Sequence, residues 1–555
     1  MHHNRSIKWM AVLVLGITIL QHSSAAQPEF EQAPSESGPE HTQPVVSITK
    51  GRELSVSLGP NASPAEKRAA ELLIDAVKQR TGIELSTGNP AQGSDALILG
   101  TAQSHPLVRD YLARRNDAGK LSTDGFVVAW EPGEKRWYVA GQSPSGAVAG
   151  VGRLLRGIRF EQGRLSLPAA RFSDAPAMPI RGIYLWARDF YFKSKNLDRY
   201  IEEFALWGGN SLALWFELGM FSSFEDPQAQ HWREAYRRCF ETAQRVGMKT
   251  TLILVANDAY QSSAKQFRIS PIIGCPGHYL CPSKPEGARQ LLAWQDQLIK
   301  SFSHLDGLII FPADPGGCSC ADCTPWPTEG FWRAARPLGE RFHERFPEAD
   351  VWVAFWHLHH PTFGGENWQQ LVKLLGEHRP AWLTGIQPGM APHHPFAKVT
   401  PAEQQIYADA GLPLSLFPEV SMYRNHGGML VKKGYWEQMR AEMTRYPAGQ
   451  MRGGWPYSER WNTDIANVAF LCWFWNPQKT VDAVLDEYAS WYFGPSAPEA
   501  RQLLQLLDDG NRAPDREAKV REVFAKLDRQ LPGWVREDWR WKEIATSAAR
   551  LGAGK

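Results

Sequence analysis

The sequence predicts an α/β protein with an N-terminal α/β sandwich-like domain (45–175), a central (β/α)8 TIM barrel (176–475) and a C-terminal helical region (476–555). Three observations predict this order. Strands and helices alternate before residue 175, eight short apolar runs alternate with helical patterns between 181 and 455, and helical spacing alone follows. Continuous apolar strands between helices are typical of a parallel barrel, whose strands are covered on both sides.

Residues 1–44 are predicted to precede the folded domains. Arg5 and Lys8 stand before an apolar run at 10–20, and small residues follow at 23–26, which is the pattern of a secretory signal peptide with its cleavage site. The run is too short to span a bilayer, and residues 27–44 are a polar, flexible leader. We therefore expect an exported protein, periplasmic or extracellular, with no membrane anchor.

The N-terminal domain shows clear helix and strand signals. Ser63, Pro64 and Glu66 form a predicted capping box with proline at the first helical position, and Gly82 ends that helix. Strands are predicted at 53–59, 96–100, 125–130 and 136–141, and a second helix at 145–155. The glycine-bearing turn at 141–147 lacks a following Gly-Lys-Ser/Thr, so it is interpreted as a strand-to-helix turn and not as a phosphate site.

A family resemblance rests on the order of these elements. Helix AAELLIDAVKQRTGIEL, strands ALILGT, DGFVVAW and RWYVAG, and helix SGAVAGVGRLL follow one another. This order resembles the domain that precedes the catalytic barrel in bacterial β-N-acetylhexosaminidases of glycoside hydrolase family 20 and α-glucuronidases of family 67. The resemblance implies that a (β/α)8 barrel with glycosidase activity follows.

The next 300 residues contain the elements that such a barrel needs. Barrel strands are predicted at 181–186, 211–216, 249–255, 307–311, 350–356, 381–387, 412–418 and 449–455. Helices are predicted at Leu197–Trp207, Trp232–Val246, Pro285–Phe302, Phe331–Phe346, Trp368–Glu377, Ala402–Ala410 and Tyr435–Tyr446.

Candidate site residues follow the barrel strands, because the active site of this fold lies at the C-terminal strand ends. Carboxylates, tryptophans and amides gather there: Trp186, Arg188, Asp189, Glu217, Asn257, Asp258, Asp314, Trp356, His357, Gln387, Glu419, Tyr457 and Glu459. Glycoside hydrolysis requires this mixture, with one carboxylic acid to protonate the leaving oxygen, a second carboxylate as nucleophile or base, and aromatic platforms for the sugar.

The catalytic roles are carried over from glycosidase barrels, in which an acid after strand four commonly faces a nucleophile after strand seven. This implies Asp314 as the acid and Glu419 as the nucleophile or base, with Glu459 as a third candidate that can replace either. Family 20 has an Asp-Glu pair after strand four, whereas this chain has the single acid Asp314. The predicted substrate-binding residues are Trp186, Arg188, Glu217, Asp258, Trp356, His357, Tyr457 and Trp461, with Trp455 as an alternative to Trp461 in lining the cleft.

Cysteines and histidines raise the question of metal binding. Cys239 and Cys472 lie in helical patterns and are predicted to be buried apolar residues, whereas Cys281, Cys318, Cys320 and Cys323 form either disulfides or a four-thiolate zinc site. The histidine clusters at 357–360, 392–395 and 425–428 lack an HExxH spacing and are interpreted as sugar-binding loops. No cofactor and no catalytic metal are expected.

The amino-acid composition indicates which class of partner the protein binds. The 61 basic and 59 acidic residues nearly balance, so nothing indicates a nucleic-acid partner, and the 23 tryptophans suit a carbohydrate substrate. The sequence therefore predicts an exported glycoside hydrolase. The alternatives are a catalytically inactive carbohydrate-binding barrel and a metal-dependent polysaccharide esterase or deacetylase. The sugar, the linkage, retention or inversion, and the oligomeric state stay open.

Overall fold

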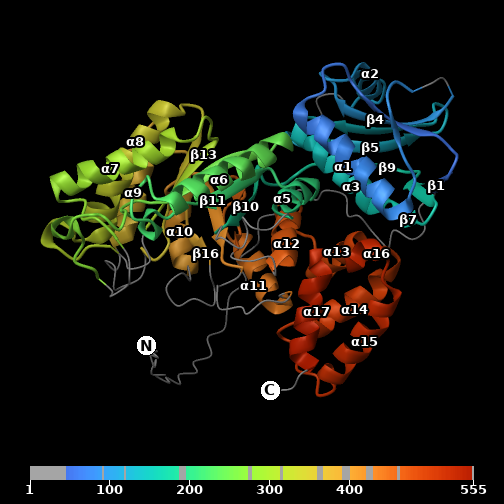
Figure 1. Ribbon diagram of the computed structural model, residues 1–555. Helices are drawn as coiled ribbons and strands as arrows, with labels where there is room; N and C mark the ends of the chain where they lie inside the picture. Colours follow the sequence, from blue (N-terminus) through green and yellow to red (C-terminus); the bar gives the residue numbers. More distant parts are fainter. Residues whose placement is uncertain are drawn as a thin grey trace, which may run out of the picture. The chain divides into compact units, whose positions relative to one another are not determined.

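The computed structural model describes residues 45–90, 93–117, 121–186, 196–272, 278–312, 317–358, 367–390, 400–420, 429, 431–458 and 463–552 (Figure 1). These residues all belong to one compact unit. The predicted signal peptide and leader lie outside the described residues. No helix in the described ranges is long and apolar enough to cross a membrane.

The N-terminal part contains two sheets. A three-stranded sheet has the order β1 (Val45–Thr49), β8 (Arg164–Pro168) and β7 (Arg159–Glu161). A six-stranded sheet has the order β3 (Ser86–Thr87), β2 (Leu54–Leu58), β4 (Asp95–Thr101), β6 (Arg136–Gly141), β5 (Phe126–Glu131) and β9 (Arg171–Asp174). The larger sheet has helices on both faces, because side chains of a strand point alternately to its two sides.

Alternation along β4 shows how these helices are placed. Ala96 and Ile98 pack with the side of α2 (Pro106–Arg114), whereas Leu97 and Leu99 belong to the core shared with α1 (Pro64–Thr81) and α3 (Pro144–Gly157). The predicted capping box of α1 is confirmed. The backbone N–H of Glu66 donates to Ser63 Oγ at 3.2 Å, the Glu66 carboxylate accepts from the Ser63 N–H at 2.6 Å, and Gly82 ends the helix with φ 72°.

Eight parallel strands form the closed barrel that the sequence predicts. They are β10 (Ile180–Leu185), β11 (Ser211–Trp215), β12 (Lys249–Val255), β13 (Gly307–Phe311), β14 (Asp350–Ala354), β15 (Gly385–Gln387), β17 (Leu414–Pro418) and β18 (Met451–Gly454). Pairing of β18 with β10 closes the ring. Two short strands extend it: β16 (Gly389–Met390) pairs with β17, and β19 (Tyr457–Ser458) pairs with β10.

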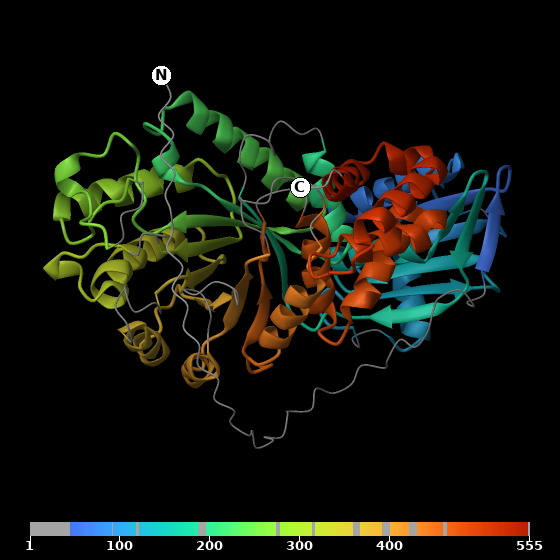
Figure 2. The same ribbon diagram turned by 90° about the horizontal axis from the view of Figure 1, so that it is seen from below.

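Helices lie around these strands in the two views (Figures 1 and 2). They are α5 (Leu197–Leu206), α6 (Pro227–Arg245), α7 (Pro285–Lys300), α8 (Trp332–Arg345), α9 (Asn367–Glu377), α10 (Pro401–Asp409), α11 (Lys433–Met443) and α12 (Asp464–Trp475). Helix α6 begins ahead of the predicted Trp232, because the Asp226 carboxylate accepts from the Gln228 N–H at 2.9 Å and Pro227 occupies the first helical position. Cys239 in α6 and Cys472 in α12 are buried, as predicted.

Aromatic side chains fill the barrel interior. Trp455 is 3% exposed, its Nε1–H donates to Ser211 Oγ at 2.9 Å, and its ring packs against Trp352 with centroids 6.2 Å apart. Gly182 leaves the space for this ring, since a Cβ there would lie 2.0 Å from it. The structure therefore corrects the interpretation of Trp455 as a cleft residue, because this side chain packs inside the barrel against Trp352 and Gly182.

The C-terminal helices are α13 (Val481–Phe493), α14 (Ala497–Leu507), α15 (Arg516–Gln530), α16 (Gly533–Arg536) and α17 (Trp539–Gly552). A buried ion network fastens α17 to the barrel helices. Arg540 Nε lies 2.7 Å from Asp464 Oδ2 in α12, and its Nη1 lies 2.7 Å from Glu203 Oε2 in α5. The guanidinium also lies over the Tyr492 ring, 3.8 Å from its centroid. The helical region is thereby attached to the barrel at several points.

Candidate active site

Glu419 lies at the C-terminal end of β17, the seventh barrel strand. Leu414 and Leu416 face the surrounding core and Phe417 faces the barrel interior, so alternation places Glu419 on the inward side at the barrel mouth. Glu419 is 2% exposed. A buried carboxylate at the C-terminal end of a barrel strand is a candidate functional group, because the active site of this fold lies at these strand ends.

The backbone around Glu419 is held from two sides. It forms an isolated parallel bridge with Tyr457, and the Tyr435 hydroxyl of α11 donates to the Glu419 carbonyl oxygen at 2.7 Å. Burial, followed by the negative charge of Glu419, raises the pKa of the Tyr435 hydroxyl. Tyr435 therefore stays protonated at neutral pH and keeps donating this hydrogen bond.

An aromatic layer lines the barrel mouth beside Glu419. The Phe417 ring packs against Tyr184, Tyr457 and Trp356 with centroids 5.1, 5.4 and 5.6 Å apart. The layer continues through Phe311, Trp215 and Trp186. Predicted site residues Trp186, Trp356 and Tyr457 thus belong to one continuous and largely buried aromatic cluster, in which Trp356 and Tyr457 are each 8% exposed.

His357 extends this layer and has an unusual backbone. Its φ is 61°, which is uncommon for a residue with a side chain, and its ring stacks on Trp356 with centroids 4.8 Å apart. The residue is 8% exposed. Such backbone conformations occur preferentially at functional sites, which supports the predicted role of His357 in binding.

Two buried amides at strand ends join the candidate site. Gln387 closes β15, and Asn257 follows β12. Asn257 Nδ2 donates to the Leu280 carbonyl at 3.2 Å, whereas Asn257 Oδ1 and Gln387 Oε1 have no hydrogen-bond partner among the described residues. A buried amide oxygen without a donor is ready to accept a hydrogen bond from a ligand hydroxyl. Sequence reasoning placed both residues at strand ends but assigned them no role.

The carboxylates of Glu217 and Asp258 influence each other at the ends of β11 and β12. Asp258 is 2% exposed, and both of its carboxylate oxygens accept from the Gly219 N–H, at 3.2 and 3.1 Å. Burial, followed by the charge of Glu217, raises the pKa of Asp258 well above its usual value. Asp258 thus fixes the turn that carries Glu217, and its predicted contact with substrate stays a prediction.

The Glu217→Gln variant is expected to be more stable than the parent at neutral pH. Because the pKa of Asp258 is raised in the folded state, folding keeps its proton while the unfolded chain loses it, so stability falls as pH rises above about 4. Removing the Glu217 charge lowers the pKa of Asp258, and each pKa unit by which it falls restores about 1.4 kcal/mol of stability.

Melting temperatures of the parent and of Glu217→Gln, measured between about pH 4 and about pH 8, should differ more as the pH rises. Glu234→Gln, an exposed change on α6, is the control; a separation that does not depend on pH would contradict the coupling.

Four predicted site residues lie outside the described residues: Asp314, Arg188, Glu459 and Trp461. The same holds for Asp189 and for the histidines His359, His360, His393, His394 and His426. Within the described ranges, the group of residues suited to hold a metal is Cys281, Cys318, Cys320 and Cys323.

Solved glycoside hydrolases share this architecture at low sequence identity. BtGH115A, a family GH115 4-O-methyl-α-glucuronidase with specificity for decorated arabinogalactans, aligns over 91% of this chain and 72% of its own, with 12% identity and a TM-score of 0.59. The GH20 β-N-acetylhexosaminidase from Streptomyces coelicolor aligns over 85% and 95%, with 15% identity and a TM-score of 0.54. CpGH84B aligns over 92% and 89%, with 12% identity and a TM-score of 0.56.

The chain has the barrel fold of these glycoside hydrolases. The predicted resemblance to family 20 enzymes is thereby confirmed at the level of fold. No protein-family model and no curated protein matches the sequence.

Proposed function

We propose that this protein is a glycoside hydrolase that cleaves O-glycosidic bonds of an oligo- or polysaccharide at the C-terminal face of its barrel. The observation that carries the proposal is Glu419, a buried carboxylate at the end of the seventh strand, next to the aromatic layer of Trp356, Phe417 and Tyr457. The shared fold of several glycoside hydrolase families supports it.

Each part of the site has a role in this chemistry. Glu419 acts as nucleophile or as the base that activates water, and Asp314, with Glu459 as alternative, protonates the leaving oxygen. The aromatic layer contacts the apolar face of the sugar ring. Asn257 Oδ1 and Gln387 Oε1 accept hydrogen bonds from sugar hydroxyls. Positioning by several such contacts converts binding energy into correct alignment of the scissile bond.

The substrate class within this proposal is a hexosaminide or a glucuronide. The two structural neighbours of known activity reported above act on such sugars, one as a β-N-acetylhexosaminidase and one as an α-glucuronidase. The signal-peptide pattern at the N-terminus supports export, so the substrate is encountered in the periplasm or outside the cell.

A panel of chromogenic glycosides tests the proposal. It includes N-acetylhexosaminides, glucuronides and neutral hexosides, assayed with the parent protein and with Asp314→Asn and Glu419→Gln. We expect the parent protein to hydrolyse one substrate class. We expect both variants to remain folded and to lose this activity. Turnover that survives both changes contradicts the assignment of the acids. Binding of an oligosaccharide, measured by calorimetry, without turnover of that same sugar indicates the inactive carbohydrate-binding barrel instead.

A further inference from the structure

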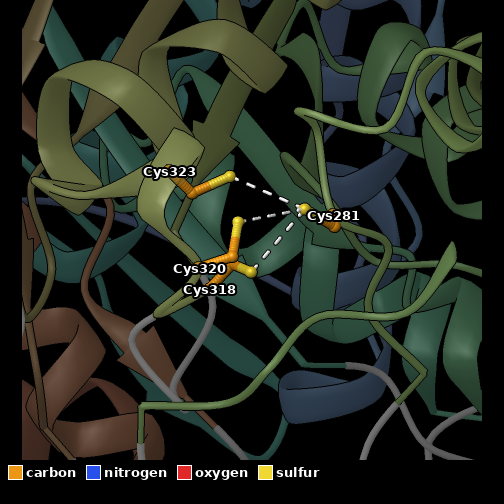
Figure 3. Close-up of side chains that lie close together, drawn as sticks. All are labelled: Cys281, Cys318, Cys320 and Cys323. Atoms are coloured by element: carbon orange, nitrogen blue, oxygen red, sulfur yellow. Dashed lines mark hydrogen bonds between the residues drawn. The ribbon is translucent and has the colours of Figure 1, made fainter.

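Four cysteine side chains from two different barrel loops converge on one point (Figure 3). Cys281 lies between β12 and α7, and Cys318, Cys320 and Cys323 lie between β13 and α8. The Sγ atoms all lie within 4.8 Å of one another. Cys281 Sγ is 3.6 Å from the sulfurs of Cys318 and Cys323 and 3.7 Å from that of Cys320.

These distances match a shared metal centre. A disulfide joins two sulfurs at about 2.05 Å, which is much shorter than the three separations from Cys281 Sγ. A tetrahedral zinc ion with Zn–S bonds of about 2.3 Å separates its sulfur ligands by about 3.8 Å. When four sulfur ligands surround one metal ion, the distances from one sulfur to the other three are expected to be nearly equal. Disulfide pairing would instead bring one of these sulfurs much closer to Cys281 Sγ than the other two.

Donors next to the sulfurs complete the site. The Ser270 N–H donates to Cys318 Sγ at 3.4 Å, and the Ser283 hydroxyl lies 3.0 Å from Cys281 Sγ and 3.6 Å from Cys320 Sγ. Amide and hydroxyl donors of this kind reduce the negative charge on metal-bound thiolates and orient them. Cys281, Cys318 and Cys323 are buried, which protects such a centre from water.

The peptide around the cysteines is packed so as to hold this arrangement. The Cys281 N–H donates to the Phe267 carbonyl at 2.8 Å, and the Ser319 N–H donates to the Ser270 carbonyl at 2.8 Å. Trp326 is 1% exposed and packs directly on Gly317, where a Cβ would lie 2.0 Å from its ring. The two loops therefore meet through backbone pairing and close packing, and the sulfurs are brought together by these contacts.

We propose that Cys281, Cys318, Cys320 and Cys323 bind one structural Zn²⁺ that ties the loop after the third barrel strand to the loop after the fourth. Because all four positions are taken by protein thiolates, the centre has no open position for substrate and is structural, not catalytic. Asp314 lies shortly before Cys318 in the sequence, so a zinc ion bound by Cys318 would restrain the loop that carries Asp314. The proposal does not depend on the glycosidase activity.

Metal analysis of the purified protein tests it. Elemental mass spectrometry of the full chain, prepared without chelator, is expected to find about one zinc ion per chain. Cys320→Ser, at the least buried of the four positions, should lose most of the metal, whereas Cys239→Ala, a buried cysteine in α6, should keep it. Exchange with Co²⁺ should produce the intense near-ultraviolet thiolate-to-cobalt band and the visible bands of a tetrahedral site.

Two measurements on the parent protein can contradict the zinc site, so the test does not depend on whether the variants fold. Peptide mapping under non-reducing conditions that finds a disulfide between Cys281 and Cys318, Cys320 or Cys323 would do so. Absence of bound metal after incubation with zinc, with the four thiols still reduced, would also do so. Iron at the site in place of zinc would overturn the identity of the metal, because a four-thiolate tetrahedron also accepts iron.

Discussion

Glu419→Gln is expected to reduce kcat by about 10²–10⁴-fold while leaving the melting temperature close to that of the parent. Glutamine preserves the shape of the side chain but removes the negative charge, so it can neither attack the anomeric carbon nor accept a proton from water. The aromatic layer of Phe417, Trp356 and Tyr457 remains in place, so KM should change much less than kcat. Steady-state kinetics on the substrate identified by the glycoside panel measures both.

The matched control for this prediction is Glu437→Gln. Glu437 lies on α11, the helix that follows the same strand, and its side chain is 49% exposed. This change should leave kcat and KM as in the parent. Equal losses in Glu419→Gln and Glu437→Gln, or a loss in Glu419→Gln that disappears at saturating substrate, would contradict a role of Glu419 in the chemical step.

Arg540→Met is expected to destabilise the protein by about 3–5 kcal/mol. The Arg540 side chain is 2% exposed and pairs with Asp464 and Glu203, whose side chains are 1% and 8% exposed. Methionine fills much of the volume but leaves the Asp464 carboxylate buried without its cation, whereas Glu203 keeps its ion pair with Arg199 at 2.7 Å. Breaking one partner of a buried ion network costs more than the network itself contributes, because the remaining charges stay desolvated. Urea unfolding, followed by circular dichroism, measures the loss.

Two comparison variants separate this effect from a general loss of charge. Arg333→Met removes an exposed pair with Glu329 and should change the free energy of unfolding by less than about 1 kcal/mol. Adding Asp464→Asn to Arg540→Met should recover part of the loss, since it removes the buried charge that has lost its cation. A double variant less stable than Arg540→Met alone would contradict the view that the unpaired Asp464 charge is the main cost.

The elements of the fold were predictable because their signals are local. The Ser63 and Glu66 capping box, the left-handed Gly82 and the apolar strand runs each follow from a short stretch of sequence. The short strands β1, β7, β8 and β9 were not predicted as separate elements. All four have three to five residues. Strands β1, β7 and β8 form one sheet, in which β1 pairs with β8 more than a hundred residues away in the chain.

The location of the candidate site could be predicted from the sequence, but the contacts of its individual side chains could be predicted only in part. Knowing that barrel sites lie at strand ends identified Glu419, Trp356 and Tyr457. The same rule cannot tell which way a side chain points once the strand ends. Asp258 accepts from the Gly219 N–H in a neighbouring turn, and Trp455 points into the barrel core. The convergence of Cys281 with the later cysteines depends likewise on two loops meeting in space.

Hydrolysis in water labelled with heavy oxygen tests the central claim most directly. The protein is incubated with a mixture of plant and bacterial polysaccharides, and mass spectrometry locates the label in the products. A glycoside hydrolase transfers the water oxygen to the anomeric carbon, so the label is expected at the reducing end of released sugars and should be absent with Glu419→Gln. Label in released acetate or another acid would contradict the proposal and indicate an esterase or deacetylase. Unlabelled polysaccharide that is nevertheless bound by the protein would contradict it in favour of an inactive binding barrel.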